Sequence, residues 1–318
     1  MVFLAGELLA GAARYGLELM LANPAGGRIM GRKIVVGAAQ TGPVLSEDMR
    51  PAADAACAMI EEAAAKGVEI VCFPEVFLTP FFPAQLRADY AQFFMELPSP
   101  ITDPFLDLAR EKGIAVIFGY GERAGSYFYN SSAIFDRDGR HLGTYRKTHL
   151  PAILPSNRAG GTGSYEKMYF SPGGALPIFE IDGLRFGIQI CYDRKFPEGS
   201  RALALQGAEI IFMPICAATY GETTLRDNTW ALPLQSRAYE NGVFVVAVNR
   251  CGDENGRRHI GQSMIVNPVG AEIIVEGGRD EPVLLVATLD LDDVAEAQRS
   301  LPWWRDRRPD LYARLVAQ

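Results

Sequence analysis

The sequence predicts a mixed α/β fold, in which helices cover sheets that contain both parallel and antiparallel strands. Short apolar runs alternate with amphipathic helical stretches from Lys33 onward, as expected for strands separated by helices. A tight turn at Asp136–Gly139 joins two strand candidates directly, as in an antiparallel hairpin. The chain has 318 residues, 48% of them hydrophobic, which is enough for one large core.

Residues 1–32 differ from the rest and are predicted to form an amphipathic extension. Apolar side chains recur there at helical spacing, at Leu4, Leu8, Ala12, Tyr15 and Leu19. Asn23-Pro24 and Gly26-Gly27 would end this helix, and no basic region precedes its apolar stretch as in a secretory signal. We expect the segment to dock on its own core or on a neighbouring subunit. The alternative is an upstream extension, with the working start at Met30.

The elements of the predicted domain, residues 33–318, follow one another with recognisable boundaries. The first helix has Ser46 near its start and Gly67 as a stop, and the second closes at Gly113. In chain order we expect strands or helices at Lys33–Ala39, Met49–Lys66 (helix), Glu69–Phe73, Ile101–Lys112 (helix), Ile114–Tyr120, Ser131–Asp136, Leu184–Ile190, Pro197–Gln206 (helix), Glu209–Pro214, Thr224–Glu240 (helix), Val243–Val248, Ser263–Val266, Glu272–Glu276, Val283–Leu289 and Leu291–Arg299. The longest unpatterned stretch, Leu154–Ser164, is typical of a functional or mobile loop.

Composition excludes several classes of function. The net charge is −7 with no basic run, so we expect no nucleic-acid partner, and no apolar run is long enough to span a bilayer. The cysteines form no paired spacing, which favours free thiols in a reducing, cytoplasmic setting: Cys57, Cys72, Cys191, Cys216 and Cys251. The three histidines show no metal-ligand spacing, so no metal site is predicted: His141, His149 and His259.

Three chemically active side chains each follow a strand-like run. Glu75 comes after Pro74, Lys147 lies in Tyr145–Pro151, and Cys191 stands where a strand meets a helix. A strand-to-helix corner presents a side chain beside backbone N–H groups that have no partner, as an oxyanion requires. Taken singly, each residue has a bland interpretation: a turn glutamate, a solvated lysine and a small buried thiol.

Together the three residues form a coherent catalytic group. A carboxylate shielded in a pocket can take the proton of a thiol, which is a poor nucleophile until it is deprotonated. An ammonium group beside the sulfur favours the thiolate and can stabilise a tetrahedral oxyanion. Cys216 also follows an apolar strand and is a rival nucleophile, but no charged helix start follows it, so we interpret it as core.

These segments resemble the three signatures of the nitrilase superfamily of carbon–nitrogen hydrolases. The likeness extends from about Lys33 to the C-terminus and rests on the ordered segments Phe73–Glu75, Tyr145–Pro151, Ile190–Glu198, Leu205–Ile211 and Asn267–Gly270. The resemblance implies a four-layer α-β-β-α sandwich with a Glu–Lys–Cys triad and no cofactor. It further implies that Glu75 is the base, Lys147 the oxyanion stabiliser and Cys191 the nucleophile. Glu166 matches a second glutamate that orients the lysine and holds the substrate's amide.

Neighbouring residues resemble one branch of that family, the N-carbamoyl-D-amino acid amidohydrolases. The loop Phe73–Pro83 is similar to that branch, as is the run after the cysteine, where two arginines bind the substrate carboxylate; here they are Arg194 and Lys195. A lysine offers only a point charge where an arginine offers a planar fork. His149 matches the branch, whereas Ser164 stands where the branch has histidine. The tail from Trp304 to Tyr312 instead resembles the N-carbamoylputrescine amidases.

The predicted function is therefore hydrolysis of an N-carbamoyl amino acid to the amino acid, ammonia and carbon dioxide. Arg194, Lys195, His149 and the backbone N–H of Tyr192 are the expected substrate contacts. The alternatives are a β-ureidopropionase, an N-carbamoylputrescine amidase, an aliphatic amidase, a nitrilase, or a non-catalytic binding protein on the same fold. A thiol redox protein is disfavoured because Cys191 has no resolving cysteine nearby in sequence. A homodimer or homotetramer is expected, with the tail after Arg299 as a contact surface.

Overall fold

The computed structural model describes residues 31–154, 163–218, 229–300 and 302–316. The extension predicted for residues 1–32 therefore lies outside the described residues except for its last two positions, as do most of the loop Leu154–Ser164 and the first part of the helix predicted at Thr224–Glu240. From Lys33 onward the chain forms one compact unit.

The first sheet has seven strands and is mixed. Its path is β15 (Val283–Asp290), β1 (Lys33–Gln40), β2 (Ile70–Cys72), β4 (Ala115–Ala124), β5 (Tyr127–Phe135) and β6 (His141–Arg146), with β3 (Phe94–Met95) paired to β4. The strands β1, β2 and β4 run parallel, whereas β15 is antiparallel to β1 and hairpins join β4, β5 and β6. The predicted mixture of helix-separated and hairpin-joined strands is thus confirmed.

The second sheet has six strands and is mixed in the same way. Its order is β14 (Ile273–Glu276), β13 (Met264–Val266), β10 (Phe244–Val248), β9 (Ile210–Pro214), β8 (Leu184–Ile188) and β7 (Phe179–Ile181). The strands β8, β9 and β10 are parallel, β7 and β13 pair antiparallel with β8 and β10, and β14 pairs antiparallel with β13. A separate hairpin consists of β11 (Cys251–Glu254) and β12 (Arg257–Ile260).

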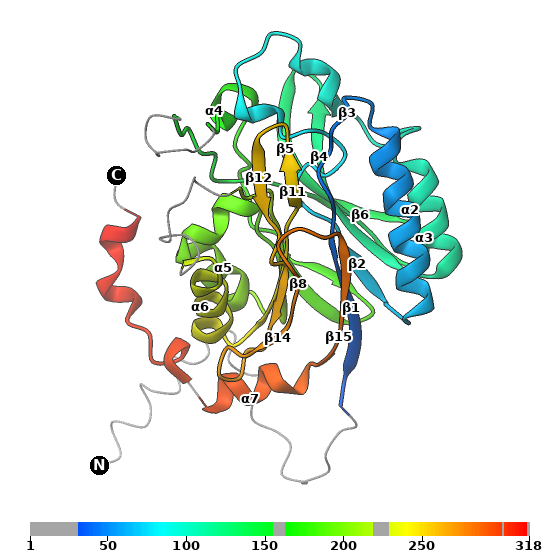
Figure 1. The fold of residues 1–318 in the computed structure, drawn as a ribbon. Helices are drawn as coiled ribbons and strands as arrows, with labels where there is room; N and C mark the ends of the chain where they lie inside the picture. The colour runs from blue at the N-terminus through cyan, green and yellow to red at the C-terminus, as the bar shows by residue number, and fades with distance from the viewer. Residues whose placement is uncertain (1–30, 155–162, 219–228, 301, 317–318) are drawn as a thin grey trace, which may run out of the picture. The chain divides into compact units, whose positions relative to one another are not determined.

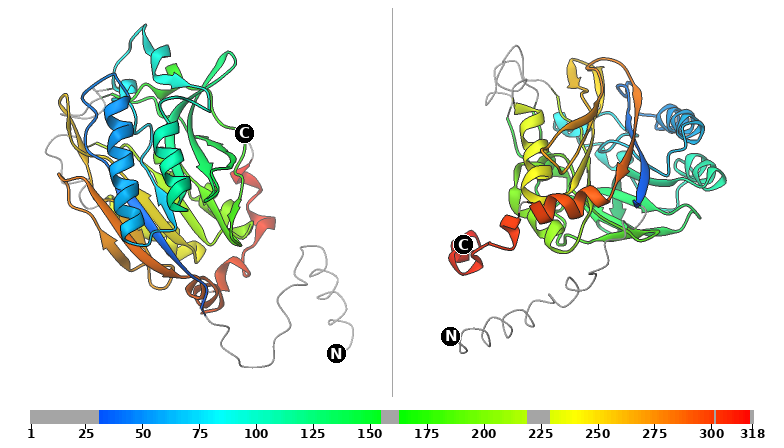
Figure 2. Two further views of the ribbon diagram at one scale, coloured as in Figure 1. Left: turned by 90° about the vertical axis from the view of Figure 1, so that its right-hand side faces the viewer. Right: turned by 90° about the horizontal axis from the view of Figure 1, so that it is seen from below.

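The two sheets stack face to face, and helices cover their outer faces. The helices α2 (Arg50–Ala65) and α3 (Asp103–Lys112) lie on the first sheet, while α5 (Pro197–Leu205) and α6 (Ala231–Asn241) lie on the second (Figures 1 and 2). The short helix α4 (Glu166–Tyr169) and the helix α7 (Asp292–Ser300) lie outside these layers. The arrangement is a four-layer α-β-β-α sandwich.

Alternation along the strands produces the layers. In β2, Ile70 and Cys72 belong to the core between the sheets, whereas Val71 packs beneath α2 and α3. In β10, Phe244 faces the other sheet, and Val245 lies under the helices of its own side. Because successive side chains of a strand point to opposite faces, strands buried on both faces must be apolar throughout, as these are.

The covering helices form for recognisable local reasons. Along α2 the buried side chains Ala53, Ala56, Ile60 and Ala63 recur at intervals of three and four residues and face the sheet. The helix α3 ends at Gly113, whose φ of +68° provides the left-handed C-cap that glycine adopts without strain.

Several short pieces of regular structure were not expected from the sequence, among them β3, α4, β7 and the hairpin β11–β12. The hairpin β11–β12 lacks an apolar alternation, since Cys251–Glu254 and Arg257–Ile260 are mostly polar or charged. The strand β7 is only three residues long. Within the described residues, the helix predicted from Thr224 begins at Ala231. None of the described helices combines the length and apolar character needed to cross a membrane.

Candidate active site

The three strand ends predicted to carry chemistry lie at the junction of the two sheets. Glu75 follows β2 and Lys147 follows β6, both in the first sheet, while Cys191 follows β8 in the second. Glu166, at the start of α4, joins them. The side chains of Glu75 and Lys147 are wholly buried, and that of Glu166 is nearly so.

Lys147 links the two glutamates. Its Nζ donates to Glu75 Oε1 at 2.7 Å and to Glu166 Oε2 at 2.6 Å. Asn130, on β5, donates from Nδ2 to the same oxygen of Glu75 at 2.7 Å. The backbone continues this network, since the N–H of Lys147 donates to the carbonyl of Asn130 at 2.8 Å. One oxygen of Glu75 is therefore fixed by two donors.

The charges in this network compensate one another. Burial alone would lower the pKa of Lys147, but the carboxylates of Glu166 and Glu75 raise it well above its ordinary value. Burial raises the pKa of Glu166 to about 7, against the opposing effect of Lys147. The second oxygen of Glu75, Oε2, is buried and has no hydrogen-bond partner among the described residues. That oxygen is free to accept a proton.

Cys191 stands at the predicted corner and starts the 3₁₀-helix Cys191–Lys195. Its φ of +46° is uncommon for a residue with a side chain and is typical of a sharp turn that presents a nucleophile. The residue is half-buried. Burial and the charge of Glu75 raise the pKa of its thiol, while Lys147 and Arg194 oppose that rise. The resting sulfur is therefore protonated at neutral pH, and attack requires a base.

The carboxylate of Asp193 joins the segment of Lys147 to the segment of Cys191. Its Oδ2 accepts from Tyr145 Oη at 2.7 Å and from the N–H of Ile190 at 2.9 Å. Its Oδ1 accepts from Thr148 Oγ1 at 3.0 Å and from the N–H of His149 at 2.9 Å. A single buried side chain thus holds the end of β6 against the corner that follows β8.

The predicted substrate contacts next to Cys191 differ in how far they are buried. Arg194 is buried beside the sulfur, where its Nη1 donates to the Cys191 carbonyl at 2.6 Å and lies 3.6 Å from Sγ. Its guanidinium also lies over the ring of Trp230, at 4.9 Å. Tyr192 directly follows the nucleophile and packs edge-on against Phe196. Lys195, by contrast, is exposed at the end of the 3₁₀-helix.

His149 is held by two neighbours. Its Nδ1 lies 2.8 Å from Asp193 Oδ1, and its ring stacks on Phe196 at 3.9 Å. Its side chain is 37% exposed, so one edge of the imidazole reaches solvent. This geometry is compatible with a structural role, in which Asp193 fixes the imidazole, and with a direct contact between the imidazole and a bound molecule.

Cys216, the rival nucleophile, is buried in the core as expected. Its Sγ lies 3.8 Å from His259 Nδ1. Burial raises the pKa of this thiol far above its ordinary value, so it stays protonated. Like Cys191, it follows a buried strand. Unlike Cys191, it does not lie beside the ion-pair network of Lys147, and no edge of its side chain is exposed.

Sequence reasoning missed two members of the site, Asn130 and Asp193. Asn130 begins the buried stretch of β5 and is followed by two buried serines, and such a buried polar run could have indicated polar partners. Asp193 lies within the cysteine segment Ile190–Glu198, but its role depends on which backbone groups lie nearby. Those contacts are formed between two sheets and have no signature in local sequence.

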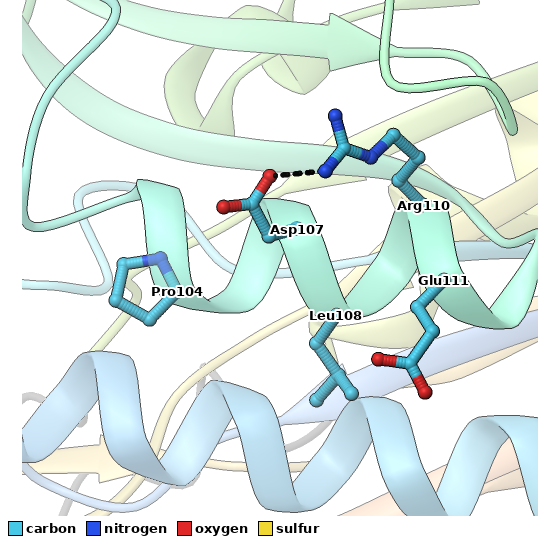
Figure 3. Close-up of a pocket in the computed structure, with 5 residues that line it drawn as sticks. All are labelled: Pro104, Asp107, Leu108, Arg110 and Glu111. Carbon is cyan, nitrogen blue, oxygen red and sulfur yellow. Dashed lines mark ion pairs between the residues drawn. The ribbon is translucent and has the colours of Figure 1, made fainter.

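A hollow of about 620 Å³ lies elsewhere, on the outer side of α3 (Figure 3). It is lined by Pro104, Asp107, Leu108, Arg110 and Glu111. Figure 3 shows these side chains along one exposed helix, with Asp107 paired to Arg110 at 2.9 Å. No nucleophile lines it, so the buried ion-pair network, rather than this hollow, marks the candidate site. Within the described ranges, no cluster of His, Cys, Asp or Glu could hold a metal ion.

Comparison with known proteins gives a consistent result. The profile of the carbon-nitrogen hydrolase family matches residues 35–299. The chain is 35% identical over 297 residues to the N-carbamoylputrescine amidase of Arabidopsis thaliana, a match that covers 90% of this chain and 96% of that protein. It is 34% identical over 270 residues to the citrullinase of Francisella tularensis, covering 81% and 90%. Neither is an N-carbamoyl-D-amino acid amidohydrolase, the branch that the loop after Glu75 favoured.

Several solved structures share this fold. The crystal structure of a carbon-nitrogen hydrolase from Helicobacter pylori superposes with a TM-score of 0.80 at 26% identity, covering 90% of this chain and 99% of that one. An amidase from Nesterenkonia sp. superposes with a TM-score of 0.71 at 26% identity, covering 92% of this chain and 100% of that one.

Proposed function

Because the chain belongs to the carbon-nitrogen hydrolase family of the nitrilase superfamily, whose members hydrolyse amide or ureido groups, we propose that it hydrolyses the ureido group of a small N-carbamoyl compound through a thioester on Cys191. The observation that supports the proposal is the buried network in which Lys147 bonds Glu75 and Glu166 next to a protonated thiol. It supplies a base, a cation and a nucleophile at one place, so the chemistry needs no metal or cofactor.

The first half of the reaction forms the acyl-enzyme. Glu75 takes the proton of Cys191, and the sulfur bonds to the ureido carbon. The oxygen that becomes negative is held by Lys147 and by the backbone N–H of Tyr192, which lies at the start of the 3₁₀-helix where no intrahelical acceptor is available. The C–N bond to the terminal nitrogen then breaks. Ammonia leaves with the proton from Glu75, and a carbamoyl thioester remains on the sulfur.

The second half releases the product. Glu75 takes a proton from water, whose oxygen attacks the thioester carbon. The C–S bond breaks, the thiol recovers its proton, and a carbamic acid leaves. Loss of carbon dioxide from that acid gives the free amine. Glu166 supports both halves by fixing Lys147 with its Oε2 and by offering its other oxygen to the substrate N–H groups; Ser164 Oγ lies 3.3 Å from that oxygen.

Arg194 favours an N-carbamoyl amino acid as the substrate. The buried guanidinium lies beside the sulfur, its Nε has no hydrogen-bond partner among the described residues, and no carboxylate there forms an ion pair with it. A substrate carboxylate would complement this charge. A substrate ending in an ammonium group would be repelled by it.

The second candidate is an N-carbamoyl compound that ends in an amine. It is favoured by the likeness to the N-carbamoylputrescine amidase and by the tail from Trp304 to Tyr312. For this candidate Arg194 would serve only to hold the Cys191 carbonyl, a role that needs no substrate carboxylate, and its charge would disfavour an ammonium group close to the sulfur.

A substrate panel distinguishes the candidates. Ammonia release would be measured with both enantiomers of N-carbamoylalanine, with N-carbamoylputrescine, with citrulline, and with a simple amide and a nitrile. We expect the highest kcat/KM on an N-carbamoyl amino acid, and Arg194→Gln should lower it more for that class than for the other substrates, since the bond to the Cys191 carbonyl is lost for all of them. Preference for N-carbamoylputrescine would move the assignment to the second candidate. Turnover of the amide or nitrile alone would contradict ureido specificity.

A further inference from the structure

A buried ion pair lies beside the loop that carries Glu75. Arg250 follows β10, and Glu254 ends β11 in the hairpin that the sequence did not predict. The Arg250 side chain is wholly buried, that of Glu254 is almost so, and Nη1 of the arginine donates to Oε2 of the glutamate. Neither residue belongs to the ion-pair network of the candidate active site. A pair this deeply buried is costly to desolvate and gives weak evidence for stability alone.

The polar atoms of this pair bond mainly to one loop. Arg250 Nη2 donates to the carbonyls of Val76 and Thr79, both at 3.0 Å. Glu254 Oε1 accepts the N–H of Phe81 at 2.6 Å. Three backbone groups within six consecutive residues are thereby fixed, and the first of them belongs to the residue directly after Glu75.

The conformation of Val76 explains why such fixing is needed. Its φ is +40°, a left-handed value that is strained for a β-branched side chain. The neighbouring fold must therefore hold it there. The bond from Arg250 to the Val76 carbonyl does so, and it sets the direction in which the preceding residue presents its carboxylate.

We propose that Arg250 and Glu254 are positioning residues, which hold the loop after Glu75 so that its carboxylate meets the thiol of Cys191. The inference rests on the proposed function in that it takes Glu75 as the base. Neither residue touches the reacting atoms, and both act through the backbone of Val76–Phe81.

The charge state of the pair supports this role. Burial alone would raise the pKa of Glu254, but Arg250, His259 and the Phe81 N–H hold it well below its usual range. The pair therefore stays ionised throughout the neutral range, and its geometry does not vary with pH there.

The test compares Arg250→Lys with a core variant of similar stability. Lysine keeps the charge but cannot reach Glu254 and two carbonyls at once. Ile60→Ala, in the helix α2 on the outer face of the first sheet, destabilises the core but removes none of the hydrogen bonds that hold the loop. For each protein we would measure the Tm, kcat, KM, and the pH dependence of Cys191 alkylation by iodoacetamide. Alkylation needs no knowledge of the substrate.

We expect Arg250→Lys to lower kcat about 10- to 100-fold with KM nearly unchanged, as for a misplaced base. Cys191 alkylation at neutral pH should slow alongside kcat, and Ile60→Ala should show neither effect. Adding Val76→Gly to Arg250→Lys should restore part of both rates, because glycine adopts the left-handed conformation without strain. Glu254→Gln serves as the second variant.

Several outcomes would overturn the inference: a kcat loss no greater than that of Ile60→Ala, a loss confined to KM, or no effect of Val76→Gly. Failure of both Arg250→Lys and Glu254→Gln to fold would do the same, because the pair would then be structural. Glu75→Gln separates this inference from the proposed function. If that variant does not slow alkylation, the assignment of the base fails; if it does but Arg250→Lys does not, only the positioning role fails.

Discussion

At the scale of single residues, the thiols of Cys191 and Cys216 differ in what surrounds them. Cys191 has an exposed edge beside Glu75 and Lys147, whereas Cys216 is sealed in the core near the ion pair of Arg250 and Glu254. The chemistry of a cysteine is set by its access and its charged neighbours rather than by its burial after a strand.

Cys191→Ala should therefore abolish turnover while the fold persists. We expect kcat to fall at least about a thousandfold, since the covalent route is lost. The matched variant, Cys216→Ala, should retain most of the activity at some cost in stability. Ammonia assays together with thermal melts would check both. Substantial activity in Cys191→Ala would refute the nucleophile assignment.

His259 predicts how stability depends on pH. Burial lowers its pKa to about 4, although Glu254 opposes that effect, so the folded protein keeps the imidazole neutral where an unfolded chain protonates it. At this residue the unfolded state then binds more protons between about pH 6.5 and 4, so His259 by itself lowers the free energy of unfolding as the pH is lowered through that range. The expected loss is about 3 kcal/mol.

Urea denaturation at pH 7, 6, 5 and 4 would measure this loss. The raised pKa of Glu166 acts in the opposite direction over part of this range, so the contribution of His259 is read from the difference between wild type and His259→Asn. The stability of His259→Asn relative to wild type should rise as the pH falls from 7 to 4.5, where Glu254 does not yet contribute, and that of the exposed His141→Asn should not. The same pH dependence in wild type and His259→Asn would contradict a neutral buried His259.

At the scale of elements, Asp193 joins two segments that no sheet hydrogen bond connects. It accepts donors from the end of β6 and from the corner after β8. Replacing it with asparagine would set an amide N–H₂ against N–H and O–H donors. We expect Asp193→Asn to cost about 2 kcal/mol of stability and to lower kcat more than KM.

Denaturation and steady-state kinetics on Asp193→Asn would measure the two effects. Asp136→Asn is the matched control, because Asp136 is also buried and accepts backbone N–H groups, but in the turn between β5 and β6. Equal effects on kcat in both variants would show that Asp193 has no special link to the site.

Elements with strong apolar patterns could be predicted from the sequence, and those defined by tertiary contacts could not. Expected strands such as Lys33–Ala39 and Val283–Leu289 differ from β1 and β15 by a single residue at the end. The β11–β12 hairpin was missed because its charged residues are satisfied by distant partners, as Arg250 and Glu254 are by the loop after Glu75. The nucleophile, its cation and its base could be named from ordered motifs, whereas the side chains that hold them could not.

At the scale of the whole molecule, we propose that the chain forms a homo-oligomer. Trp303, expected in a subunit contact, packs against Tyr239 of its own α6. Farther along the tail, Leu311, Leu315 and Val316 are all at least 65% exposed. Apolar side chains gathered so closely on a surface are typical of a contact with another molecule.

Sedimentation of the full chain should show a dimer or a larger assembly, and Leu311→Asp with Leu315→Asp should shift it toward monomer. Leu45→Asp is the matched control, because Leu45 is equally exposed but lies between β1 and α2. A wild-type chain that sediments as a monomer would remove the proposal.

The placement of the reactive groups on both sheets has a consequence for how the protein responds to heat. The sulfur is attached to one sheet and the ammonium and carboxylate to the other, and the side chains between the sheets set the gap that separates them. A slight loosening of that interior would widen the gap while every strand remained in register. The geometry of the reactive groups thus depends on the packing between the sheets. Activity should therefore be lost some degrees below the temperature at which the protein unfolds.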